Sequence, residues 1–142
     1  MLSFTQEKKP YVIHLSMKKI WYEGDSLVFK NPKNFILHTA SKTDTVEVGK
    51  AGKTPIAICV DVRKVSKNKK LMYQIGYAFY EKSAGSWKAI RHFGYTERYE
   101  LLKKPEYIKM NTSAKPAREE YYCQWGEPLQ FMASFNMDVY LN

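Results

Sequence analysis

The sequence predicts an all-β fold, or a mainly β fold with one short helix, arranged as an antiparallel β-sandwich or a partly open β-barrel. Aromatic residues make up 15% of the 142 residues, and such rings are favoured in strands. Several segments alternate apolar and polar residues with the period of two that is typical of half-buried strands. No long helix, internal repeat or linker is visible, so we expect residues 1–142 to form a single β-rich domain.

The N-terminal half predicts short strands separated by polar turns. Residues 11–17 alternate, and a second apolar segment at residues 20–22 ends at a turn over residues 23–26. Further short strands are expected at residues 27–30, 35–39 and 45–48. A Gly- and Lys-rich connection at residues 49–55 then leads to a half-buried strand. That strand has an apolar face of Ile56, Ile58, Val60 and Val62.

Residues 71–99 predict a hairpin with an aromatic face. Gly85 suits the last position of a three-residue loop, Ser83-Ala84-Gly85, which would place Lys82 opposite Ser86. In that register one face holds Tyr73, Ile75, Tyr77, Phe79, Trp87, Ala89, Arg91, Phe93 and Tyr95. Because two other strands have apolar faces that need cover, we expect this aromatic face to lie at the centre of the core.

The C-terminal part predicts a short helix at residues 98–104 and a strand at residues 119–125. The clearest alternation in the chain follows. Its apolar face comprises Leu129, Phe131, Ala133, Phe135, Met137, Val139 and Leu141. Its polar face comprises Gln130, Ser134, Asn136 and Asp138.

The two cysteines, Cys59 and Cys123, stand in strand-like segments without a disulfide framework, so both are expected to be buried thiols. This usage indicates a reducing compartment, cytoplasmic or otherwise intracellular, with a virion as a further possibility. Residues 1–10 lack the apolar run of a signal peptide, and no segment has the length of a membrane span. We therefore expect no membrane association.

No catalytic set, metal site or cofactor site is predicted. The segment Gly49-Lys50-Ala51-Gly52-Lys53-Thr54 ends like a phosphate-binding loop, but Glu47 stands where that motif needs a glycine. Pro55 and a strand follow it instead of a helix, which favours a cationic hairpin loop. His14, His38 and His92 are far apart, and the acidic residues do not cluster. We therefore expect a protein that is not an enzyme.

Positive charge is the property that departs most from the average. The chain has 23 basic and 14 acidic residues, a net charge of +9 and a pI of about 9.4. Basic residues stand near aromatic ones, a combination that binders of single-stranded nucleic acid use for phosphate contacts and base stacking. We therefore predict a nucleic-acid-binding β-domain, with single-stranded DNA or RNA favoured. The expected contact residues are Lys18, Lys19, Trp21, Arg63, Lys64, Lys67, Lys69, Lys70, Trp87 and Arg91.

A second interpretation assigns the same positive charge to contacts within a protein assembly or with an acidic protein. The protein would be a structural or assembly subunit of a multi-protein particle, such as a phage or viral component, or would bind an acidic protein partner. Abundant tyrosine suits protein interfaces as well as cores, and a homo-oligomer is included in this interpretation.

Overall fold

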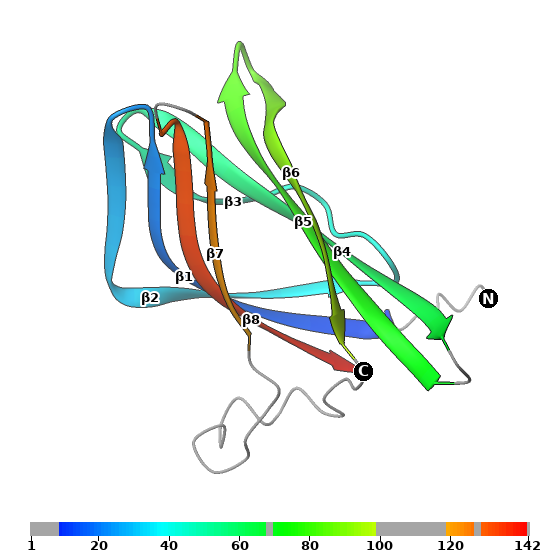
Figure 1. The fold of residues 1–142 in the computed structure, drawn as a ribbon. Helices are drawn as coiled ribbons and strands as arrows, with labels where there is room; N and C mark the ends of the chain where they lie inside the picture. Colours follow the sequence, from blue (N-terminus) through cyan, green and yellow to red (C-terminus); the bar gives the residue numbers. More distant parts are fainter. Residues whose placement is uncertain (1–8, 68–69, 99–118, 127–128, 142) are drawn as a thin grey trace, which may run out of the picture.

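The computed structural model describes residues 9–67, 70–98, 119–126 and 129–141, which form eight strands in two four-stranded antiparallel sheets (Figure 1). Sheet A has the strand order β2-β1-β8-β7, and sheet B has the order β3-β4-β5-β6. The strands are β1 (Tyr11–Tyr22), β2 (Asp25–Thr39), β3 (Val46–Ala51), β4 (Thr54–Lys67), β5 (Lys70–Ser83), β6 (Ser86–Arg98), β7 (Glu119–Trp125) and β8 (Phe131–Leu141).

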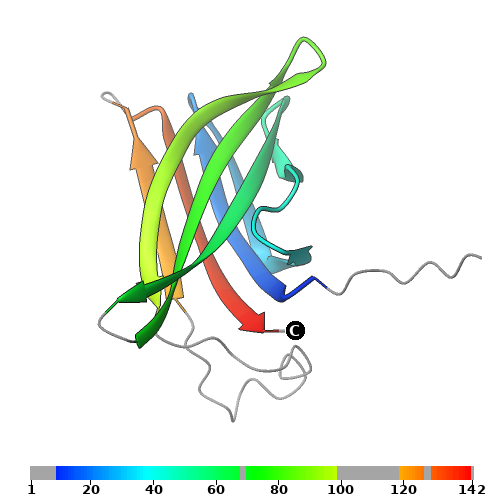
Figure 2. The same cartoon turned by 90° about the vertical axis from the view of Figure 1, so that its right-hand side faces the viewer.

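The two sheets pack against each other as a β-sandwich and do not close into a barrel (Figure 2). This arrangement confirms the predicted all-β fold class and identifies the sandwich as the correct one of its two predicted forms. Each strand pairs with its neighbours in the chain except at β2–β3 and β6–β7, where the chain passes from one sheet to the other. The pairing of β1 with β8 joins the two ends of the chain within sheet A. Among the described residues there is no helix of the length and apolar character needed to cross a membrane.

The core lies between the two sheets, and aromatic rings of β5 and β8 form its centre. The ring centroid of Phe79 is 4.9 Å from that of Phe131 and 5.7 Å from that of Phe135. Tyr77 meets Phe135 edge-on at 5.2 Å. Burial of such rings is the main source of stability in a small domain. The prediction that the aromatic face of residues 71–99 forms the centre of the core is confirmed for the rings of β5.

The predicted register of the β5–β6 hairpin was wrong by one residue at the turn, and two further register shifts raise the error to three residues at Tyr73. Ser83 pairs with Ser86, so the turn has two residues, Ala84 and Gly85, with φ angles of 52° and 83°. Two positive φ angles are typical of the tight turn whose twist matches that of the flanking strands. The pattern pointed to a longer loop because a positive φ is uncommon for alanine. The ring of Trp87 therefore lies next to Lys82, whose Nζ is 5.6 Å from the ring centroid, instead of sharing a face with Phe79.

The predicted breaks within the first two strands are also wrong, because β1 and β2 are each continuous across them. Lys18 is an extra residue in β1, where the pairing shifts from Met17 opposite Lys33 to Lys19 opposite Val28. Four residues of β2 lie opposite this single bulged residue, and β2 turns sharply there (Figure 1). Pro32 is tolerated in β2 because β2 is an edge strand, whose free side needs no backbone donor.

Most of the remaining predicted strands are confirmed. The apolar faces that begin at Ile56 and Phe131 are fully buried, and β7 has the predicted bounds. Leu129 and Leu141, at the two ends of the predicted C-terminal face, are 40% and 41% exposed. The expected connection at residues 49–55 was too long, since residues 52 and 53 alone form the turn between β3 and β4. The predicted helix extends past residue 98 into a segment outside the described residues.

Candidate functional site

The outer face of sheet A, which is turned away from sheet B, carries polar side chains in register across three strands. Each residue of β1 except the bulged Lys18 has one partner on β2 and another on β8, and paired residues point to the same face. The first row is Ile36, His14 and Asp138, and the second row is Asn34, Ser16 and Asn136. Apart from Ile36, which is 56% exposed, the two rows form one continuous polar patch.

A groove of about 480 Å³ opens over this patch, a volume in the usual range of small-molecule sites. Lys18 lines it at the bulge of β1, and Asn31 and Pro32 of β2 line it beside that bulge. Tyr140 lines it at the other end, beyond the row of His14. The groove therefore joins a cationic end to an end that contains a carboxylate.

The carboxylate of Asp138 is unusually well buried for the outer face of a sheet, with 3% of the residue exposed. Its Oδ1 atom and the Nε2 atom of His14 are both shielded from solvent. The His14 ring packs on Tyr140 with 4.4 Å between the ring centroids. Burying a carboxylate is costly unless hydrogen-bond donors surround it, so this end of the groove favours groups that donate hydrogen bonds.

The second row is arranged by a hydrogen bond across two strands. The hydroxyl of Ser16 donates to Oδ1 of Asn34 at 2.7 Å. Because this bond uses the amide oxygen of Asn34, its amide nitrogen, with two N–H donors, is the group that Asn34 offers to the groove. Ser16 is 7% exposed, so it is positioned to orient Asn34 more than to contact a ligand itself.

The surface beyond the groove, towards the β1–β2 turn, is cationic and partly aromatic. Lys19 and Trp21 lie on the outer face, where they are half-buried, and Val28, the partner of Lys19, is 63% exposed. Lys30 is exposed on the neighbouring strand, whereas Lys33, the partner of the inner-face residue Met17, does not belong to this surface. The alternation that buries Ile20 on the inner face places Lys19 and Trp21 outside.

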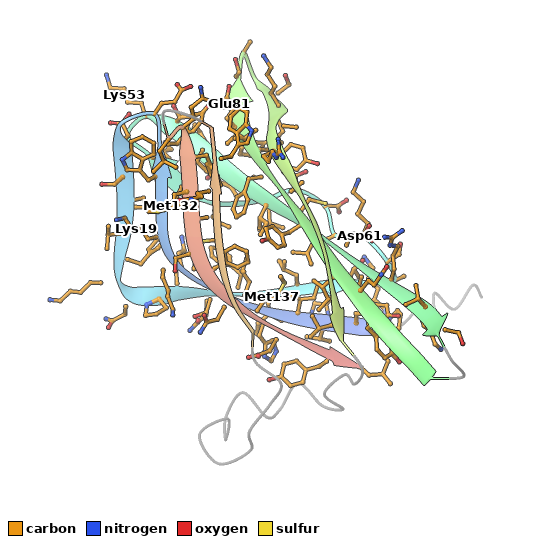
Figure 3. The ribbon with its side chains drawn as sticks, viewed as in Figure 1. Lys19, Lys53, Asp61, Glu81, Met132 and Met137 are labelled. Carbon is orange, nitrogen blue, oxygen red and sulfur yellow. The ribbon has the colours of Figure 1, made fainter. Side chains whose placement is uncertain are left out.

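The structure distributes the residues predicted to contact nucleic acid over three places. Lys18, Lys19 and Trp21 lie together on the outer face of sheet A. Arg63, Lys64, Lys67 and Lys70 lie at the end of sheet B where β4 meets β5, on the opposite side of the molecule from Lys19, as the positions of Lys19 and Asp61 show in Figure 3. Trp87 lies near the other end of sheet B, at the turn between β5 and β6 (Figure 1).

The β4–β5 end of sheet B is the second basic region. Arg63 and Lys64 are exposed, and Lys67 pairs with Lys70 through the backbone next to the turn. The side chains of Lys67 and Lys70, and the whole of Lys69, lie outside the described part of the structure. This region consists of the ends of two paired strands, β4 and β5.

The residues predicted in β6 do not join either region. Arg91 is exposed and pairs with Phe79 midway along β5. Trp87 lies about 40 Å from the β4–β5 turn, since about 13 residues at 3.3 Å per residue separate the two ends of β5. A single strand contacting all ten predicted residues would have to cross both sheets.

Sequence reasoning missed Asn34, Asn136 and Asp138 as groove residues. The available signal was the polar face predicted for the C-terminal strand, which includes Asn136 and Asp138. What the pattern did not contain is the register of β8 with β1, which brings Asp138 opposite His14 although they are far apart in the chain. That pairing depends on the whole topology.

Other reactive groups in the described residues do not form a second site. Cys59 is a free, buried thiol, as predicted, and donates to the backbone oxygen of Thr43 at 2.9 Å. Burial raises the pKa of the Cys59 thiol, while the hydrogen bond that the Thr43 hydroxyl donates to Sγ partly opposes that shift, so the group is protonated at neutral pH. The side chain of Cys123 lies outside the described residues. Within those residues no group of three His, Cys, Asp or Glu side chains could hold a metal ion.

Comparison of the chain with protein-family models, with curated proteins and with solved structures finds no match.

Proposed function

We propose that the protein binds single-stranded nucleic acid along the outer face of sheet A, without catalysing a reaction. The main support is the charge of the two strands at this face. Strand β1 and residues 26–39 of β2 contain four lysines and no aspartate or glutamate. This cationic part of the face attracts phosphates, and the carboxylate of Asp138 lies at the far end of the groove from Lys18. The lysines of the outer face are Lys18, Lys19 and Lys30, whereas Lys33 pairs with the inner-face residue Met17 and lies over the ring of Phe35.

The apolar groups at this face favour a single strand over a duplex. Trp21 is half-buried, which leaves part of its ring accessible, and the exposed Val28 lies one row away. Unpaired bases offer their faces for stacking on such groups, whereas in a duplex the bases are stacked on one another. Stacking of this kind tolerates many sequences, so it adds affinity more than specificity.

The basic end of sheet B provides a second electrostatic contact in the same proposal. Arg63 and Lys64 are exposed there, but Asp61 on the same strand reduces the local positive charge. We therefore assign the outer face of sheet A the larger share of the binding free energy. The two regions lie on opposite sides of the molecule, so one strand would contact them both only by wrapping around it.

The test is binding of a fluorescent single-stranded oligonucleotide of mixed sequence, followed by anisotropy at several salt concentrations. Affinity should fall steeply with salt, because each neutralised phosphate contributes about 0.7 to the logarithmic slope for single strands. The double variant Lys18→Glu, Lys19→Glu should bind much more weakly and lower the slope by about 1.4. The matched control is Lys50→Glu, Lys53→Glu in the exposed β3–β4 hairpin, which makes the same charge change.

Absence of binding at low salt would reject the proposal, and so would an equal loss of affinity in the two double variants. Light scattering of the same samples addresses the alternative of an assembly subunit. An assembly subunit should self-associate, or recover an acidic protein partner, whether or not an oligonucleotide is present.

A further inference from the structure

We propose that the groove on the outer face of sheet A binds one nucleotide, with its phosphate at Lys18 and an amine-bearing base at Asp138. The inference rests on the proposed function in one respect, namely that a bound strand supplies the nucleotide. The groove itself would also accept a free nucleoside monophosphate, and the experiment below separates the two sources.

The length of the groove matches a phosphate and a base held at opposite ends. Lys18 and His14 are four residues apart on β1, a span of about 13 Å for an extended chain. Asp138 is the partner of His14 on β8, so the lysine and the carboxylate stand at the two ends of that span. This separation allows an anionic group to bind at Lys18 without facing the carboxylate of Asp138.

The polar groups between these ends suit the edge of a base. Asn34, held through its oxygen by Ser16, offers its amide nitrogen as a donor, and Asn136 lies across β1 from it. Asp138 offers only acceptors when it is ionised, and a carboxylate has room for several hydrogen bonds. A donor and an acceptor set side by side match the alternating donors and acceptors along a base edge.

The carboxylate also decides which bases fit best. Cytosine, adenine and guanine carry an exocyclic amine that donates hydrogen bonds, and a carboxylate is a known type of partner for the amine of cytosine. The imide N–H of uracil or thymine is flanked by two carbonyl oxygens, which a carboxylate repels. The groove should therefore prefer cytosine to uracil or thymine, although these pyrimidines have nearly the same size.

The experiment compares cytosine with thymine or uracil in both ligand forms. Oligo-dC and oligo-dT are titrated by anisotropy, and CMP and UMP by calorimetry, against the wild-type protein and the variant Asp138→Asn. The wild type should prefer the cytosine ligand by about tenfold in each pair. Asp138→Asn should lose this preference while the salt dependence of oligonucleotide binding stays unchanged. The matched control is Asp61→Asn, the same change on sheet B, which should keep the preference.

The outcomes separate this inference from the proposed function. Equal binding of oligo-dC and oligo-dT together with no preference for CMP overturns the inference and leaves nucleic-acid binding standing. A preference for CMP that depends on Asp138, without oligonucleotide binding, rejects the proposed function and supports the groove as a site for free nucleotides. If Asp138→Asn does not fold, Asn34→Ala at its exposed position replaces it, and an unchanged affinity for both cytosine ligands then overturns the inference.

Discussion

The two faces of sheet A bury side chains by different means. On the inner face, Phe131, Phe135 and Met137 are fully buried among apolar neighbours. On the outer face, Asp138 and Tyr140 of the same strand are almost as well buried, but beside polar groups. Apolar contacts are non-directional, whereas a buried carboxylate needs donors at defined positions.

The difference supports the assignment of stability to the inner face and of the proposed binding to the outer face. The inner face would tolerate other apolar side chains of similar volume, since packing depends mainly on volume and shape. The outer face keeps His14, Ser16 and Asp138 where apolar residues would give a simpler packing. Sites where a chain departs from the locally most stable choice are the sites where function is expected. The following predictions test this contrast, beginning with the largest effect.

Removing a ring from the inner face should cost the most stability. Phe135 packs against Tyr77 and Phe79, with centroid distances of 5.2 and 5.7 Å, and none of its surface is exposed. Phe135→Ala should lower the free energy of unfolding by about 3–5 kcal/mol, measured by urea denaturation, because it removes buried surface and leaves a cavity.

The control for this variant lies one residue away on the outer face. Ser134→Ala should change the free energy of unfolding by less than about 0.5 kcal/mol, since Ser134 points away from the core. Similar losses of unfolding free energy in Phe135→Ala and Ser134→Ala would mean that the outer face contributes as much to stability as the inner face does. Such a result would contradict the proposed difference between the two faces.

A buried hydroxyl on sheet B tests whether polar contacts away from the groove serve stability. Thr43 is 6% exposed, and its hydroxyl accepts from the backbone N–H of Val60 at 2.7 Å. Thr43→Val keeps the shape but leaves that N–H without its acceptor, so unfolding free energy should fall by about 1–3 kcal/mol. Thr43→Ser, which keeps the hydroxyl, should recover most of the loss in the same denaturation measurement. Equal stability of the valine and serine variants would show that the hydrogen bond contributes little.

The sequence was sufficient for an antiparallel all-β fold, with sandwich and barrel left as alternatives, and for most of its core, because alternation shows directly which side of a strand is apolar. The buried face from Phe131 to Val139 and the aromatic centre at Phe79 followed from this pattern alone. The alternation pattern did not predict the strand register where a bulge or a turn changes the number of residues between paired positions. The bulge at Lys18 and the Ala84-Gly85 turn each shift the register by an amount that composition does not specify.

The candidate site was harder to predict for a related reason. Lys18, Lys19 and Trp21 were identified by charge and ring chemistry, which are local properties. The partnership of His14 with Asp138 joins strands from the two ends of the chain, and no local pattern encodes it. The position of β1 between β2 and β8 places polar residues of three separate segments side by side, and these residues line one groove.

The smallest expected effect on stability concerns a polar contact between the two sheets. The hydroxyl of Tyr22, on β1, donates a hydrogen bond to the carboxylate of Glu81, on β5. Burial, and then the bond to Glu81 and its charge, raise the pKa of Tyr22 above its usual value of 10.0. Tyr22→Phe should lower the free energy of unfolding by about 1 kcal/mol at neutral pH, because both groups are only partly buried.

The same contact predicts how stability changes at alkaline pH. Because the pKa of Tyr22 is higher in the folded protein, the folded state keeps a proton that the unfolded state loses near pH 10. The stabilisation is complete below that pH and is lost as the pH rises towards the folded-state pKa. Thermal unfolding between pH 8 and 11 should therefore show a decline that Tyr22→Phe reduces but does not abolish, since burial also raises the pKa of Tyr11. Glu81→Gln, which removes the charge but keeps an acceptor, should give an intermediate decline. An identical pH profile in the wild type and Tyr22→Phe would show that the contact between the sheets does not control the proton of Tyr22.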